Sequence, residues 1–364
     1  MRYITLTSVL TLITATAWFL TGKAGAGADS SYMLIITGLV VGIMIILGGC
    51  ELFANGVECF GDRFDMSHAT VGSLLAAVGT ALPETIVPVL ALIFGKGGHG
   101  EGIAVGAILG APFMLSTLAM FLLGVTVIIL WISRRRPRAS MKVNVKALKF
   151  ELRYFISVMS VVLLVSLVKN ETLNHATAAV LLLAYAVFFY YSLKHKAEEG
   201  EQYTDNFHFG IFLGCPRTLR WVLIQIAVGL LFIIIGAYLF VDYLTVASVK
   251  SGISPLVLSL LITPIATELP EKFNSISWTL KNKDTIGIAN VTGAMVFQST
   301  IPISIGLLFT DWSLGSTEML NIIFAVMMAG IILGFVSIKK ELPGWLLLMG
   351  GVFYLLYIAR IFIY

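Results

Sequence analysis

Long apolar runs separated by short polar stretches dominate the chain. A helix needs about 20 mainly apolar residues to cross a bilayer, so each run of that length predicts a membrane span. Eleven runs qualify: 3–22, 32–60, 67–94, 102–132, 149–168, 175–193, 218–243, 252–280, 285–309, 318–337 and 343–363. The pattern therefore predicts an all-α polytopic membrane protein, and the first of the eleven runs lies within residues 1–30. That first run is interpreted as an extra N-terminal span or a signal segment.

Composition supports membrane residence and excludes several other classes. Hydrophobic residues make up 58% of the 364 residues and charged residues only 12%, against about 25% charged in an average soluble domain. The three cysteines show neither metal-binding spacing nor a disulfide framework. We expect no cofactor, no nucleic-acid partner and no required protein partner, and the partners predicted are the lipid bilayer and small cations.

Basic residues gather on one side of the predicted spans. They lie in the loops after the fourth, sixth, eighth and tenth runs, whereas loops 95–101, 169–174 and 310–317 carry few of them. Because short cytoplasmic loops are enriched in lysine and arginine, the N-terminus is predicted to be cytoplasmic and Tyr364 external. The compact length suits a prokaryotic plasma membrane. The longest polar stretch, 195–217, is predicted to be a cytoplasmic linker between two halves, 31–194 and 218–364.

Two short motifs inside apolar runs repeat each other. Residues 79–84 read Gly-Thr-Ala-Leu-Pro-Glu and residues 266–271 read Ala-Thr-Glu-Leu-Pro-Glu. A carboxylate at membrane depth is costly, which makes both glutamates functional candidates. A proline frees backbone carbonyls in a helix, and such breaks in corresponding spans of two halves are typical of transporter binding sites. The third span runs outward and the eighth runs inward, so the two copies are predicted to be inverted repeats.

The repeated motifs carry groups that suit a hard cation. Calcium prefers six to eight oxygen ligands, and the two carboxylates would together balance one divalent ion. Each threonine lies one helical turn before its glutamate, and each proline frees a carbonyl about one turn earlier. The candidate metal ligands are thus Glu84, Glu271, Thr80, Thr267 and Glu268, with the carbonyls near Gly79 and Ala266.

With these motifs in place, the chain resembles the calcium/cation antiporter superfamily and most resembles its sodium/calcium exchanger branch. The resemblance covers roughly residues 50–125 and 235–310, and includes Gly48-Gly49-Cys50-Glu51-Leu52 as well as residues 79–84. It implies a ten-span core of two inverted five-helix repeats, a calcium site with two carboxylates, and exchange by movement of two gating helices.

The chain also departs from the pattern of that superfamily. In that superfamily, the segment that follows the Pro-Glu break in each repeat typically reads Gly-Ser-Asn. Here residues 110–112 read Gly-Ala-Pro and residues 293–295 read Gly-Ala-Met. Glu268 stands where a small residue is usual. It would replace the lost charge or carry a coupled proton, because two carboxylates three residues apart repel each other when both are charged. Asn290, Thr292 and Gln298 add polar groups on the ninth span.

The predicted function is exchange of Ca²⁺, or another divalent cation, for Na⁺ across the membrane. A proton-coupled divalent cation antiporter is the first alternative, and a passive cation channel is an alternative of another class. No enzymatic activity is predicted, because the five histidines are scattered and no phosphate-binding loop is visible.

Overall fold

The computed structural model describes residues 31–63, 82–95, 99–195 and 207–363. The chain divides into two compact units. The first unit comprises Met1–Ala104 and Ala186–Ser259, and the second comprises Val105–Tyr185 and Leu260–Tyr364. Each unit combines segments that are far apart in the sequence. These units differ from the two predicted repeat halves, whose boundaries stay a prediction.

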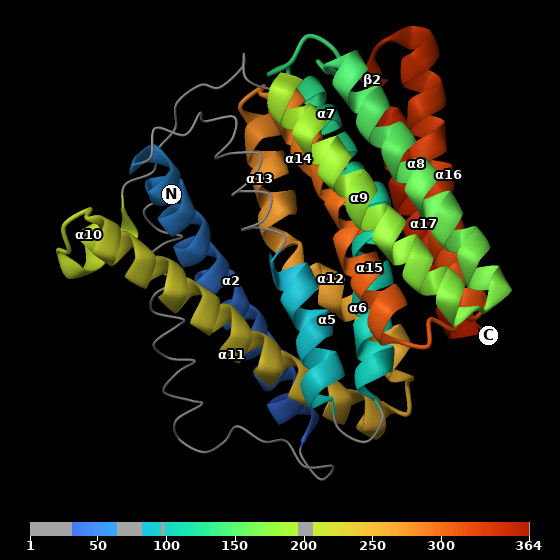
Figure 1. The fold of residues 1–364 in the computed structure, drawn as a ribbon. Coiled ribbons are helices and arrows are strands. Elements are labelled where there is room, and N and C mark those ends of the chain that lie inside the picture. Colours follow the sequence, from blue (N-terminus) through green and yellow to red (C-terminus); the bar gives the residue numbers. More distant parts are fainter. Residues whose placement is uncertain (1–30, 64–81, 96–98, 196–206, 364) are drawn as a thin grey trace. The chain divides into compact units, whose positions relative to one another are not determined.

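Most of the described residues are helical (Figure 1), and short loops and two two-residue strands make up the rest. Eight helices within the described ranges are long and apolar enough to span a membrane, and Pro83–Phe94 and Pro255–Ile265 form shorter apolar helices. The prediction of an all-α polytopic membrane protein is confirmed. The first predicted span, 3–22, and residues 67–81 of the third lie outside the described residues.

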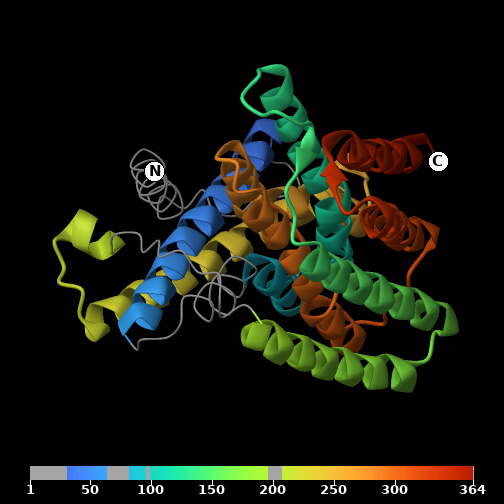
Figure 2. The same ribbon diagram turned by 90° about the horizontal axis from the view of Figure 1, so that it is seen from above.

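Two long helices form the centre of the first unit. The unit contains α2 (Tyr32–Arg63), α5 (Leu82–Phe94), α10 (His208–Leu213) and α11 (Leu219–Ser251). Helices α2 and α11 run side by side, coloured blue and olive in Figures 1 and 2. A Cβ on Gly49 would come within 2.8 Å of the Gly229 carbonyl oxygen, and a Cβ on Gly229 within 2.6 Å of the Phe53 amide nitrogen. Glycine therefore lets the two backbones touch.

The end of the predicted linker packs against this pair of helices. The side chains of Phe207 and His208 are buried. The Gln225 amide donates to the Asn55 side-chain oxygen at 3.0 Å, and the same oxygen accepts from the backbone N–H of His208 at 3.0 Å. The His208 ring lies 3.1 Å from the Glu51 carboxylate. Residues 207–213, at the end of the predicted linker, are thus attached to α2 and α11.

The second unit contains most of the remaining helices. Helix α6 (Gly100–Met114) continues through the π-helical segment η3 (Leu115–Ala119) into α7 (Met120–Ile132). Helices α6, α9 and α12 each have residues in both units. The other elements are α8 (Val145–Val168), α9 (Glu171–His195), α12 (Pro255–Thr267), α13 (Leu269–Leu280), α14 (Asp284–Gln298), α15 (Ile301–Phe309), α16 (Ser316–Lys339) and α17 (Gly344–Ile363).

A buried arginine ties the ends of several helices of this unit together. The Arg136 guanidinium forms an ion pair with Asp284 in the first turn of α14, and both side chains are at most 5% exposed. Arg136 also donates to the Asn282 side chain and to the Ser140 carbonyl. The strand β1 (Ser140–Met141) pairs antiparallel with β2 (Leu342–Pro343) just before α17. Arg136, a basic residue of the loop after the fourth predicted run, therefore has a structural role.

Candidate cation site

The second motif lies at a junction between two helices. Helix α12 ends at Thr267, Glu268 is the N-cap of α13, and Pro270 lies in the first turn of α13. The Pro270 nitrogen carries no hydrogen, so the Ala266 carbonyl lacks the donor that an unbroken helix would supply four residues later. The prediction that this span is interrupted is confirmed. That carbonyl lies close in the sequence to two buried carboxylates, Glu268 and Glu271.

Glu271 occupies the first turn of α13, with 1% of its surface exposed. The unpaired N–H groups at a helix N-terminus favour a negative charge there. The Asn290 amide of α14 donates to the Glu271 carbonyl at 3.1 Å and to the Ser275 hydroxyl at 2.9 Å. Asn290 therefore holds the start of α13 against α14.

Thr267, one turn before Glu271, is also buried. Its hydroxyl donates to the Thr263 carbonyl at 3.1 Å, which uses its hydrogen within α12. A cation would bind to the lone pairs of that hydroxyl oxygen. The polar atoms of this junction thus come from Thr267, Glu268 and Glu271, together with the backbone of α12.

An ion pair that the sequence analysis did not foresee lies at the same junction. The Lys272 ammonium is 3.1 Å from a carboxylate oxygen of Glu268, and the two side chains are 6% and 0% exposed. The ammonium also donates to the Pro264 carbonyl at 3.1 Å and lies 3.0 Å from the Met114 sulfur. A lysine four residues after a glutamate in an apolar run was the signal available in the sequence.

A second buried acid, Glu151, also escaped the sequence analysis. Glu151 of α8 is 3% exposed and accepts a hydrogen bond from the Thr292 hydroxyl of α14. Its position at the start of a predicted span gave no motif by which to find it. The bond gives Thr292 a partner on α8 and joins two helices of the second unit.

Close backbone approach supports α12 just before the junction. A Cβ on Gly110 of α6 would lie 2.5 Å from both the Leu260 carbonyl oxygen and the Pro264 ring. Gly293 is the predicted counterpart of Gly110. A Cβ added to Gly293 would have no neighbouring atom within 4 Å in the described part of the chain. The prediction that small residues allow tight packing thus holds at Gly110, and the described surroundings of Gly293 show no such contact.

The first motif is only partly described. Glu84 is 2% exposed and lies in the first turn of α5, as Glu271 does in α13. Gly79 and Thr80 lie outside the described residues. Glu84 belongs to the first unit and Glu271 to the second, and each is described within its own unit. The meeting of the two carboxylates therefore stays a prediction.

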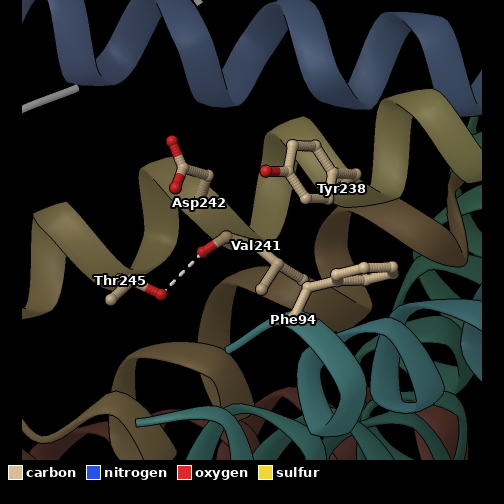
Figure 3. A pocket seen from close by; sticks show the side chains of 5 residues that line it. All are labelled: Phe94, Tyr238, Val241, Asp242 and Thr245. Atoms are coloured by element: carbon tan, nitrogen blue, oxygen red, sulfur yellow. Dashed lines mark hydrogen bonds between the residues drawn. The ribbon is translucent and has the colours of Figure 1, made fainter. Parts of the chain in front are cut away.

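A small pocket elsewhere in the first unit lies between α5 and α11. Figure 3 shows its lining, which consists of Phe94, Tyr238, Val241, Asp242 and Thr245. The Thr245 hydroxyl donates to the Val241 carbonyl at 2.8 Å. Asp242 is the one acid in this lining, so the pocket offers a cation few ligands. In the described ranges, no three His, Cys, Asp or Glu side chains gather as a metal site.

Comparison with known proteins decides the family. The sodium/calcium exchanger protein family matches residues 34–194 and 221–364, which include both glutamates of the repeated motif. The chain belongs to this family. Membership in the exchanger family confirms the resemblance found in the sequence and identifies the chain as an integral membrane protein related to cation exchangers.

The chain is also similar to a membrane protein of known sequence and to two solved structures. The uncharacterized membrane protein MJ0091 of Methanocaldococcus jannaschii is 23% identical over 270 residues, covering 74% of this chain and 80% of that protein. The crystal structure of the H⁺/Ca²⁺ exchanger CAX covers 100% of this chain and 88% of its own, with TM-score 0.73 and 15% identity. The sodium-calcium exchanger NCX_Mj covers 90% and 98%, with TM-score 0.56 and 20% identity. At these identities the two solved structures establish the fold.

Proposed function

We propose that the protein is a secondary active antiporter that exchanges Ca²⁺, or another divalent cation, for Na⁺. The observation that carries this proposal is the repeated Leu-Pro-Glu motif. In both copies the glutamate is buried in the first turn of a helix. Two such carboxylates from two halves supply the charge that balances one divalent ion.

In this proposal Glu84 and Glu271 bind the divalent cation from opposite repeats. Oxygens of Thr80 and Thr267, and the carbonyls near Gly79 and Ala266, complete the coordination. Glu268 lies next to this set, and its charge is balanced by Lys272. The net charge of the α12–α13 junction is then that of Glu271 alone, which leaves two carboxylates for one divalent ion.

Exchange requires that the site open to one side of the membrane at a time. The two motif copies, in spans of opposite direction, would form inverted repeats around a site near the membrane centre. The N-terminus would be cytoplasmic and Tyr364 external. Ion gradients rather than ATP would drive the cycle, and the exchanger family supports transport rather than enzymatic catalysis.

Proton coupling is the second candidate. The solved protein whose fold matches this chain over its whole length is named an H⁺/Ca²⁺ exchanger, and this likeness supports the candidate. Both candidates share the divalent site and differ in the ion that returns.

Proteoliposomes that contain the purified protein separate these functions. Radioactive calcium uptake is measured under an imposed Na⁺ gradient, under an imposed pH gradient, and with neither, with Sr²⁺ and Mn²⁺ as competitors. Sodium exchange predicts uptake that depends on the Na⁺ gradient, and proton exchange predicts uptake that depends on the pH gradient. Equal uptake without any counter-ion gradient, together with single-channel currents, would instead establish a passive channel.

A further inference from the structure

The Lys272 ammonium lies against two oxygen atoms and one sulfur atom. Its contacts are a carboxylate oxygen of Glu268, the backbone carbonyl of Pro264 and the sulfur of Met114, all between 3.0 and 3.1 Å away. Carboxylate and carbonyl oxygens are the ligands that hard cations such as Na⁺ prefer. The lysine side chain thus brings a positive charge to oxygens that could hold a free ion.

Burial explains why a charged Glu268 favours a cation at this position. Glu268 is completely buried, and an isolated carboxylate within a membrane is costly. Either a tethered ammonium or an ion from solution can balance its charge. Lys272 does so from within the chain, and its side chain reaches back across the helix junction to a carbonyl eight residues earlier.

The acid and the amine occur together in one copy of the repeat and are both missing from the other. At the offset of 187 residues that relates Glu84 to Glu271, Glu268 corresponds to Ala81 and Lys272 to Thr85. One copy carries both charges and the other carries neither. This pairing is the pattern expected when the lysine is present to balance the added carboxylate.

We propose that the Lys272 ammonium permanently fills a monovalent cation position formed by Glu268 and the Pro264 carbonyl. A tethered charge cannot leave with the solution ions. The exchanger therefore moves one monovalent cation fewer per cycle than it would with this position open. The inference deepens the proposed function and rests on it for the stoichiometry, whereas occupancy of the position can be measured without transport.

The first experiment measures thermal stability of the purified protein in detergent. NaCl replaces choline chloride at constant ionic strength, for the wild type, Lys272→Met, the double variant Lys272→Met/Glu268→Gln, and Lys281→Met. Lys281 is an exposed lysine at the end of α13 and serves as the matched control. A ligand that binds the folded state raises its stability in a concentration-dependent way.

The proposal predicts that Na⁺ stabilises Lys272→Met in a saturable manner and more than it stabilises the wild type. The double variant and Lys281→Met should respond to Na⁺ as the wild type does, because neither leaves the Glu268 charge unbalanced. If Lys272→Met folds only in NaCl, the proposal is also supported. If it responds no more than the double variant, or fails to fold in both salts while the double variant folds, the lysine is a structural partner alone and the proposal is overturned.

The second experiment measures stoichiometry in proteoliposomes, from the membrane potential at which net calcium flux reverses. Lys272→Met should exchange one more monovalent cation per divalent ion than the wild type does, and an unchanged stoichiometry would contradict the proposal. Absence of exchange in the wild type would refute the proposed function, and the stability measurement would still report on the Lys272 position. Normal exchange combined with a Na⁺-insensitive Lys272→Met variant would refute this inference alone.

Discussion

The Lys272 ammonium contacts the Glu268 carboxylate at 3.1 Å across the junction of α12 and α13, and both side chains are buried. Removing one partner of a buried ion pair costs about 3–5 kcal/mol, because the other charge is left uncompensated, whereas removing both is often nearly neutral. In choline chloride, Glu268→Gln and Lys272→Met should each lower the thermal midpoint substantially. The double variant should recover most of that loss, and additive losses would show that the pair is not coupled.

The two repeated glutamates should be indispensable for exchange. Each would contribute one of two charges to a buried cation, so Glu84→Gln or Glu271→Gln should reduce calcium exchange at least about 100-fold, which corresponds to roughly 3 kcal/mol. Uptake into proteoliposomes measures the effect. Gel filtration in detergent checks that each variant stays folded. Near-native exchange in either variant would remove that residue from the proposed site.

Two glycines at corresponding positions should respond differently to the same substitution. In Gly110→Ala the new Cβ would collide with the Leu260 carbonyl and the Pro264 ring, and such overpacking costs about 1–3 kcal/mol. Gly293→Ala meets no described atom within 4 Å. Thermal midpoints in detergent should fall for the first variant and change little for the second. Equal losses would argue against the close contact of α6 with α12.

The buried arginine of the second unit should contribute to stability where its neighbour does not. Arg136→Gln leaves Asp284 without its guanidinium partner and should destabilise the protein by about 3 kcal/mol. Arg135→Gln changes an exposed side chain and should have little effect. Thermal unfolding of the two variants provides the comparison. Similar midpoints would mean that the Arg136 network carries little of the stability.

The spans and the broken helix could be predicted because their causes are local. A long apolar run predicts a membrane-spanning helix, because a helix makes all its backbone hydrogen bonds within itself and needs none from the lipid. Pro270 lacks an amide hydrogen, which predicted an interruption in the eighth run, and the structure places that interruption at Glu268. The repeated motif likewise pointed to Glu84 and Glu271, and both are buried.

Other features depended on contacts between distant segments. The composition of the predicted linker could not show that Asn55 and Gln225 supply hydrogen bonds that hold its end, residues 207–213, against two helices. Glu151 was missed because its partner, Thr292, lies 141 residues away. The Lys272 contact was not predicted for another reason: a lysine offers no oxygen ligand to a metal ion.

The glycine contacts between α2 and α11 limit how those helices can move. Gly49 lies against the backbone of α11, and Gly229 lies against the backbone of α2, so each helix packs into the surface of the other. If one helix tilted or shifted alone, atoms of the two helices would overlap or a cavity would open between them. We therefore expect α2 and α11 to move as one rigid body in any conformational change.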